Sequence, residues 1–216
     1  MVPIAMVAGY ASTLFLMIGI ILLATGWRSH FFPGIGRHIF WLMLLVFIIV
    51  IKLPLWIDPF PANEGPIIHA AVVMLLVASS VGLYKGRRET AIGYEALCVL
   101  MLALVWASLR SLYAHDPMFH WVSPEADAPL LCGFLSSVFA SSYRQQFAQL
   151  SWGCALASLL LALQQYSGAL IGSAQWWDEL CTAIAAGIVC TAGIKAWQRI
   201  LSWLNGALFY KNRGSS

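Results

Sequence analysis

This 216-residue chain contains a series of apolar segments joined by short loops, and the charge of the loops alternates between basic and acidic along the chain. Ten of the twelve lysines and arginines fall in one set of loops, and seven of the nine acids fall in the other. Basic loops of a membrane protein stay in the cytoplasm during insertion. The alternation therefore predicts a polytopic membrane protein and also gives its orientation.

The composition agrees with this interpretation. Hydrophobic residues make up 61% of the chain and charged residues 10%, whereas a soluble domain carries about 25% charged residues. A chain this short could not bury so much apolar surface within itself, so we expect the lipid bilayer to cover it. The net charge of +3 then reflects topology and headgroup contacts, and no nucleic-acid partner is expected.

Seven apolar segments are long enough to cross, or nearly cross, a bilayer core of about 30 Å. The predicted fold class is therefore all-α, a polytopic integral membrane bundle of seven transmembrane helices. Basic residues follow the odd-numbered helices, which places the N-terminus outside and the C-terminus in the cytoplasm. The predicted helices span residues 4–25, 39–57, 66–84, 91–113, 128–143, 149–170 and 177–197.

The predicted helices divide the chain into two regions. Residues 1–197 form the predicted seven-helix transmembrane domain, and residues 198–216 form a cytoplasmic amphipathic tail. Apolar residues recur at helical spacing across that boundary, which is typical of a helix on a membrane surface. A straight continuation of the seventh helix is the alternative. The recurring residues are Ile194, Trp197, Leu201, Leu204 and Leu208.

The first apolar segment is expected to be a retained helix. No Lys or Arg precedes Arg28, whereas a cleaved signal peptide begins with a positive region. The sequence leaves open the alternative that this segment is a signal peptide, cleaved near Ala24-Thr25-Gly26.

Small residues four apart indicate where helices approach closely. Such pairs occur in the last three predicted helices, which we expect to form the tight half of the bundle, although the same residues could instead face lipid. The pairs are Gly133 with Ser137, Gly153 with Ala157, and Ala183 with Gly187.

Ionisable and amide side chains in apolar segments are costly and point to candidate sites. Lys52 falls about five residues before the predicted end of its helix, and Pro54 is expected to kink that helix. An outward-facing polar cavity is therefore one hypothesis, and a lysine reaching back to the interface is its alternative. The candidate cavity residues are Lys52, His69, Arg110, Asp116, Gln164 and Gln165.

Two of the charged groups have simpler interpretations. Arg110 suits the C-terminus of its helix, whose exposed carbonyls carry partial negative charge, and it could pair with Asp116 or Glu125. Glu95 follows Arg87 and Arg88 closely, so those arginines could neutralise it; a proton relay would require burial within the bundle.

Motifs for metal binding and catalysis are weak or missing. His69, His115 and His120 are the weak metal candidates, but their spacing matches no known ligand motif, and no metal or other cofactor is expected. The sequence contains no P-loop, no G-x-S-x-G elbow and no dinucleotide fingerprint. No catalytic residue is assigned. The five cysteines form no C-x-x-C pair and are expected to be buried, with a Cys132–Cys181 disulfide left open.

Three stretches carry a family resemblance. Leu23-Ala24-Thr25-Gly26-Trp27-Arg28 closes the first helix, Asp116-Pro117-Met118-Phe119-His120-Trp121-Val122-Ser123-Pro124 forms the fourth loop, and Gln175-Trp176-Trp177-Asp178 opens the seventh helix. Together with the chain length and the alternating charge of the loops, these stretches resemble the YphA-like membrane proteins of spore-forming Gram-positive bacteria, the Paenibacillus and Bacillus relatives. The resemblance implies a bacterial plasma-membrane location, and it assigns no activity and no catalytic residue.

The leading functional hypothesis is a non-enzymatic scaffold or accessory protein of the cell envelope, linked to sporulation only through the resemblance. Its expected partners are the lipid bilayer and other membrane proteins that contact its helix faces. A small-solute or ion transport protein with an outward-facing polar cavity is the second hypothesis. An intramembrane or outer-surface enzyme is the third, and it requires His69, His115, Asp116 and His120 to converge.

Overall fold

A computed structural model of the chain describes residues 8–22, 25, 37–59, 65–85, 92–116, 121–165 and 170–213. Seven α-helices lie within these ranges, and each corresponds to one predicted helix, so the all-helical character is confirmed. Three short strands accompany them. The elements are α1 (Tyr10–Leu22), α3 (Arg37–Lys52), β1 (Trp56–Ile57), β2 (Ile67–His69), α4 (Ala70–Lys85), α5 (Ile92–His115), α6 (Asp127–Phe139), α7 (Tyr143–Gln165), β3 (Leu170–Ile171) and α8 (Ala174–Arg213).

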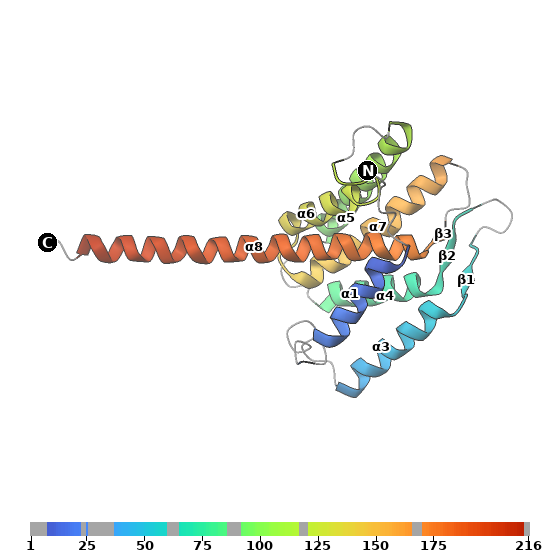
Figure 1. Ribbon diagram of the computed structural model, residues 1–216, viewed down its shortest axis with the longest axis horizontal. Helices are drawn as coiled ribbons and strands as arrows, with labels where there is room; N and C mark the ends of the chain where they lie inside the picture. The colour runs from blue at the N-terminus through green and yellow to red at the C-terminus, as the bar shows by residue number, and fades with distance from the viewer. Residues whose placement is uncertain are drawn as a thin grey trace.

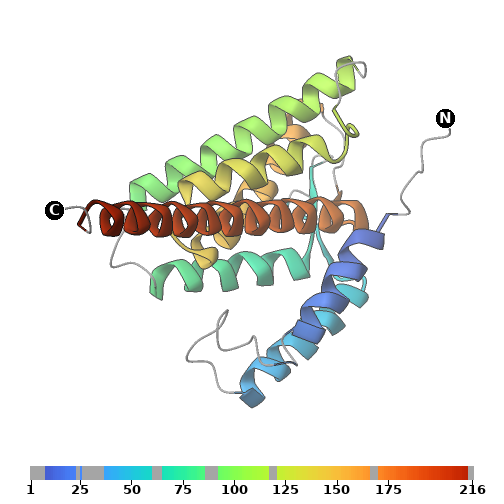
Figure 2. The ribbon, with the colours of Figure 1, turned by 60° about the vertical axis from the view of Figure 1, so that its left-hand side comes forward.

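The core of the bundle is formed by α5, α6, α7 and α8. In Figures 1 and 2, α6 lies along α8, and the two most extensive helix contacts join α6 to α8 and α5 to α7. The helix α4 packs against α7, while α1 and α3 diverge from the other helices. The largest fully buried apolar side chains come from three of the four core helices: Leu102, Leu150 and Leu180.

Glycines on α6, α7 and α8 allow the backbones of the core helices to pack closely against one another. A Cβ placed on Gly133 of α6 would lie 2.4 Å from the carbonyl oxygen of Ala183 on α8. One on Gly187 of α8 would lie 2.4 Å from Nε2 of Gln146 on α7. The close approach predicted for the last three helices is thus confirmed, and it extends to α5, because a Cβ on Gly153 would meet the Leu102 side chain.

The last helix is much longer than predicted. It continues without a break from Ala174 to Arg213, which is 40 residues or about 60 Å at 1.5 Å per residue. Its second half extends beyond the other helices (Figure 1). The predicted boundary at residue 197 therefore falls inside one continuous helix, the alternative that the sequence left open.

A small three-stranded sheet closes one end of the bundle, and no strand was predicted. The strand β2 pairs antiparallel with β1, Trp56 opposite His69, and parallel with β3, Ile68 opposite Ile171. Gly172 follows β3 with φ +99°, and a Cβ there would lie 2.6 Å from that of His69. Only glycine combines this backbone conformation with such a close approach.

The predicted boundaries of the second and third helices were wrong because extended segments replace their ends. The second was predicted to reach residue 57, but α3 ends at Lys52, and Pro54 follows the helix instead of kinking it. The residue before a proline disfavours the helical region, and the proline itself lacks an N–H. The third helix starts at Ala70, after β2, and not at residue 66.

The start of α7 was also predicted too late. The helix begins at Tyr143, where the Ser142 side chain accepts the backbone N–H of Gln145 at 3.3 Å. The Gln145 side chain reaches back and accepts the backbone N–H of Ser141 at 2.7 Å. This arrangement resembles a capping box and fixes the first turn six residues before the predicted start.

Three helices are long and apolar enough to cross a membrane by length and composition: Ile92–His115, Tyr143–Gln164 and Ala174–Trp203. Four shorter apolar helices accompany them, over Tyr10–Leu22, Trp41–Lys52, Ala70–Val81 and Asp127–Phe139. The whole helices that contain these stretches, α1, α3, α4 and α6, have 13 to 16 residues. They span roughly 20–24 Å, which is less than a bilayer core.

Candidate functional site

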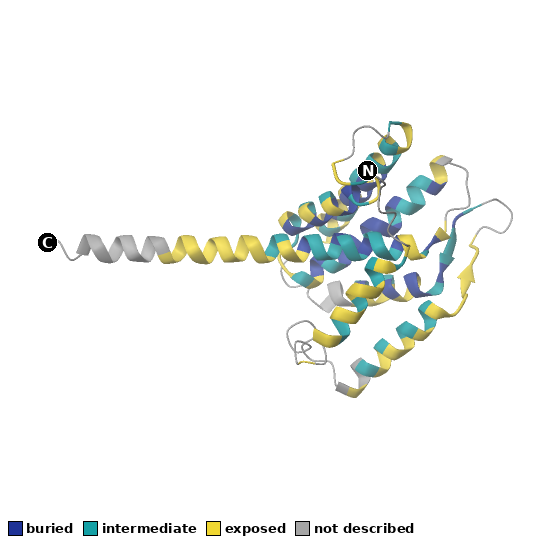
Figure 3. Cartoon of the chain, viewed as in Figure 1, coloured by how far each residue is buried: buried dark blue, intermediate teal, exposed yellow. Residues whose placement is uncertain are grey.

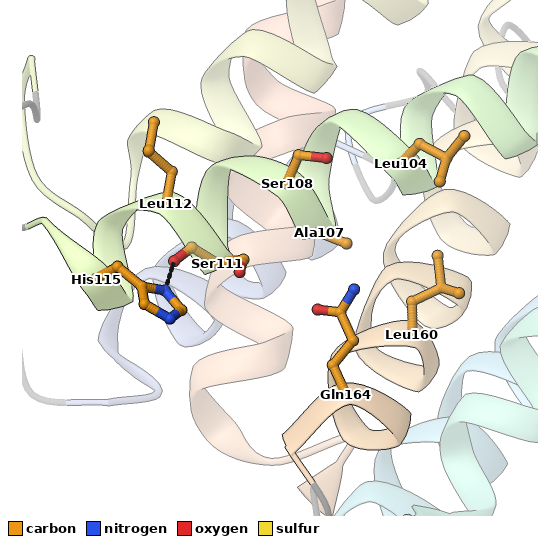
Figure 4. Close-up of a pocket in the computed structure, with 8 residues that line it drawn as sticks. All are labelled: Leu104, Ala107, Ser108, Ser111, Leu112, His115, Leu160 and Gln164. Atoms are coloured by element: carbon orange, nitrogen blue, oxygen red, sulfur yellow. Dashed lines mark hydrogen bonds between the residues drawn. The ribbon is translucent and has the colours of Figure 1, made fainter.

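A groove of about 480 Å³ lies between α5 and α7 (Figure 4). Its α5 wall is one helix face, because the residues recur three and four apart. Serine, histidine and glutamine side chains lie towards the His115 end of α5 together with Leu112, whereas Leu104 and Leu160 lie at the other end. The lining residues are Leu104, Ala107, Ser108, Ser111, Leu112, His115, Leu160 and Gln164.

The polar end of the groove offers both hydrogen-bond donors and acceptors. The Nδ1 of His115 lies 2.7 Å from the backbone carbonyl of Ser111, so Nδ1 carries the proton and Nε2 is the acceptor of the neutral ring. Gln164 extends from α7 towards α5 (Figure 4), and its amide provides a donor and an acceptor. A ligand suited to this groove would have a polar group at one end and an apolar body.

Arg110, a predicted cavity residue, forms an ion pair with Glu179 of α8. The sequence suggested Asp116 or Glu125 as its partner, but the partner is Glu179, in the second turn of α8. Both side chains are largely shielded from solvent. Within the described ranges, Arg110 Nε is buried without a hydrogen-bond partner. The pair therefore connects α5 to α8 as a structural contact.

The neighbouring Asp178 holds α1 against α8. Its carboxylate accepts the backbone N–H groups of Gly9 and Ser12, each at 2.6 Å. The first N–H groups of a helix have no partner within the helix, so Asp178 acts as an N-cap supplied by a distant segment. Gly9 adopts φ +93° where the chain enters α1.

His69, a predicted cavity and metal residue, is a buried part of the small sheet. Its Nδ1 accepts the backbone N–H of Ala71 at 3.2 Å, which leaves Nε2 to donate to the carbonyl of Leu53 at 3.0 Å. The Trp56 ring packs edge-on against it, with centroids 4.9 Å apart. Both ring nitrogens are thus engaged in fixing β1 and the start of α4.

Lys52 is exposed at the last residue of α3. The prediction that Lys52 lies about five residues before the end of its helix was wrong, because α3 ends at Lys52 itself. A cation at a helix C-terminus interacts favourably with the free carbonyls.

A second carboxylate organises the loop before α6. Asp127 accepts the backbone N–H groups of Trp121 at 2.6 Å, Val122 at 3.0 Å and Ser123 at 3.4 Å, and the hydroxyl of Tyr113 at 3.3 Å. Burial opposes ionisation of this carboxyl, but the three backbone donors and the hydroxyl outweigh it, so the pKa of Asp127 falls below its ordinary value. The loop is thereby fixed with the Trp121 side chain 85% exposed.

A polar cluster that the sequence did not reveal joins α5 to α7. Glu95 accepts the side-chain amides of Gln145 and of Gln149, the latter at 2.9 Å. Gln149 is fully buried, and its Oε1 has no hydrogen-bond partner among the described atoms. On the other side of α7, Gln146 bonds Ser136 of α6 at 3.2 Å. Glutamines four apart on α7 were the available signal for this cluster.

The remaining predicted residues are placed as follows. The backbone N–H of Asp116 bonds Leu112 at the end of α5. Gln165 ends α7, but its side chain lies outside the described residues, as does His120. Of the predicted cavity residues whose side chains the structure describes, Gln164 alone lines the groove, so a cavity shared by all six stays a prediction. In the described ranges, no three His, Cys, Asp or Glu residues are arranged to hold a metal ion.

All five cysteines are free thiols. The disulfide that the sequence left open between Cys132 and Cys181 is therefore not formed. Cys98, Cys132 and Cys154 are buried in the core, as predicted for small apolar side chains, whereas Cys181 and Cys190, also predicted to be buried, are half-buried.

Comparison with known proteins gives a family. No curated protein and no solved structure matches the chain. Residues 31–214 match the sequence model of the YphA-like integral membrane proteins. This match covers α3 to α8, and with them the groove, the ion pair and the polar cluster. The chain belongs to the YphA-like integral membrane protein family.

Proposed function

We propose that this chain is a non-enzymatic accessory protein of the bacterial plasma membrane, one that acts by binding other membrane proteins. The observation that carries the proposal is that four of the ionisable side chains stabilise the fold. Asp127 fixes a loop, Asp178 caps α1, and Arg110 pairs with Glu179. The engagement of these four side chains in the structure favours the exposed surface as the part of the molecule that acts. A role in sporulation would follow from the family resemblance alone.

The proposal includes seven membrane crossings, with the N-terminus outside and the C-terminus in the cytoplasm. The alternation of basic and acidic loops supports it. The shorter helices are compatible with it where extended residues lengthen the crossing, as β1 does after α3, since a strand advances about 3.3 Å per residue. A membrane-impermeant maleimide tests this in intact cells. Gly65→Cys should be labelled and Ser216→Cys should not; the reverse pattern would overturn the orientation.

The contact surface that we assign is the loop at Trp121 and Val122. These two side chains are 85% and 70% exposed, although the Asp127 carboxylate fixes their backbone. A rigid exposed aromatic loses little conformational entropy on binding, and tryptophan is enriched at the centres of protein interfaces. The loop is therefore ready to contact a neighbouring protein.

A photo-crosslinking amino acid at position 122 tests the assignment. The expected result is a discrete protein adduct in the native membrane, which weakens when Asp127→Ala releases the loop. Leu163 on α7 is a matched control, since its side chain is also highly exposed, at 62%, and it should give lipid adducts only. Lipid adducts alone from position 122 would overturn the assignment.

The groove favours transport of a small amphiphilic molecule as a second candidate function. It combines the imidazole of His115 and the amide of Gln164 with an apolar end, which suits an amphiphile better than an ion. Ser111→Trp would fill the groove. If the groove carries a substrate, this change should abolish uptake of a spin-labelled fatty acid into proteoliposomes. Equal uptake with and without the wild-type protein would argue against transport of this class of molecule.

A further inference from the structure

The second half of α8 is an exposed helix with a large apolar surface. Every described side chain from Ala192 to Trp203 is exposed, which Figure 3 shows as the yellow part of α8 beyond the bundle. Five of these side chains are large and apolar: Ile194, Trp197, Ile200, Leu201 and Trp203. Trp203 is 73% exposed. Apolar side chains gathered on one exposed helix mark a binding surface.

The charges of this segment identify what covers it. The last acid of the chain is Glu179, and four basic residues follow it: Lys195, Arg199, Lys211 and Arg213. A second copy of α8 would bring these like charges together and repel. A negatively charged surface would complement them, and basic residues combined with tryptophan and leucine are typical of helices that lie at a lipid headgroup layer.

The beginning of the segment lies at the end of the bundle where α7 starts. The Nζ of Lys195 lies 4.3 Å from the centre of the Tyr143 ring. Gly193 precedes it, and a Cβ there would meet no atom within 4 Å. The helix thus leaves its neighbours at a glycine, a residue that gives a helix freedom to bend. Bending there would bring residues 194–213 against the membrane that the rest of the chain spans.

We propose that residues 194–213 of α8 bind the anionic phospholipid headgroups of the membrane in which the chain is embedded. Trp197, Leu201 and Trp203 enter the headgroup region, and the Lys195 and Arg199 side chains contact the phosphates. Each basic residue near such a surface favours binding about fivefold at low salt. This inference is independent of the accessory function, because it concerns α8 and not the loop at Trp121.

Amide hydrogen exchange of the full chain in nanodiscs tests the proposal. The discs contain phosphatidylcholine alone or phosphatidylcholine mixed with phosphatidylglycerol. Exchange in peptides covering residues 194–213 should slow at least about fivefold in the anionic discs, and the difference should shrink at high salt. Peptides from residues 92–115 report on whether the bundle is folded and should exchange equally in both.

Two variants make the test specific. Arg199→Gln combined with Lys211→Gln should remove most of the difference between the discs. Arg144→Gln removes a basic residue at the same end of the bundle but on α7, and it should leave the difference intact. Equal exchange of the wild type in both kinds of disc would overturn the proposal. It would also be overturned if anionic lipid slowed exchange in the double variant as much as in the wild type. Slowing that depends on protein concentration in detergent would also overturn it and would point to a second copy instead.

Discussion

Replacing Gly133 by alanine should loosen the crossing of α6 and α8. The new Cβ would lie 2.4 Å from the Ala183 carbonyl oxygen and 2.8 Å from the Ala186 Cβ. The first of these atoms belongs to the backbone of α8, so it cannot swing aside. An ordinary contact begins near 3.4 Å, and the helices must therefore separate by about 1 Å, which weakens dispersion contacts along the whole crossing.

The expected loss can be estimated from two opposing effects. Overpacking of this kind costs about 1–3 kcal/mol. Alanine offsets part of it, because it is intrinsically more favourable than glycine in a helix by about 1 kcal/mol. The net change in the free energy of unfolding is a loss of up to about 2 kcal/mol, which lowers the midpoint of thermal unfolding by up to about 8 °C for a chain of this size.

Thermal unfolding in detergent, followed with a thiol-reactive dye, measures this change, because Cys132 and Cys154 are buried and react only when the bundle opens. Gly19→Ala is the matched control. Nothing lies within 4 Å of the Cβ that it would add to α1, so its midpoint should equal or exceed that of the wild type. A Gly133→Ala midpoint as high as that of Gly19→Ala would refute the packing argument.

Three further predictions concern the carboxylates Glu179, Asp127 and Asp178, the first through its partner Arg110. Arg110→Leu should cost about 1–3 kcal/mol, less than a fully buried pair because both side chains are partly exposed; adding Glu179→Leu should restore most of the loss in the same assay. Asp127→Asn should cost about 1–2 kcal/mol at neutral pH. Because folding lowers the pKa of this carboxyl, its contribution is present above the unfolded value of about 4 and is lost as the pH falls through the lower folded value, so wild type and variant should converge in acid. Asp178→Ala should leave α5 to α8 intact and increase proteolysis within α1, which limited digestion measures.

The sequence could predict the helices because their apolar length is a local property. It could not predict the sheet. The strands contain two or three residues each, and they form only because β3 is brought beside β2 by the packing of α7 and α8. His69 shows the consequence: it was a weak metal candidate in the sequence, and only the register with Trp56 and the position of Leu53 give it a structural role.

The candidate site was predictable where one helix face carries it and not where two distant segments meet. Gln164 was identified as a polar residue in an apolar helix, and it does line the groove. The partner of Arg110 was missed, since Glu179 is distant from it in the sequence. The Glu95 cluster was missed for the same reason, although Gln145 and Gln149 lie four apart on α7, a spacing that places both on one face.

The acids of the alternating pattern need a separate explanation from its bases. Basic residues determine the orientation of membrane helices, whereas Asp and Glu contribute little, so insertion alone would not gather seven acids on one side. Three of the seven have structural roles: Asp127 accepts backbone N–H groups of the loop before α6, Asp178 accepts those at the start of α1, and Glu179 holds Arg110. The role of Asp178 requires a helix N-terminus, whose N–H groups attract negative charge. The bases of the alternating pattern therefore carry the predicted orientation, while part of its acidic half reflects how the helices are capped and joined.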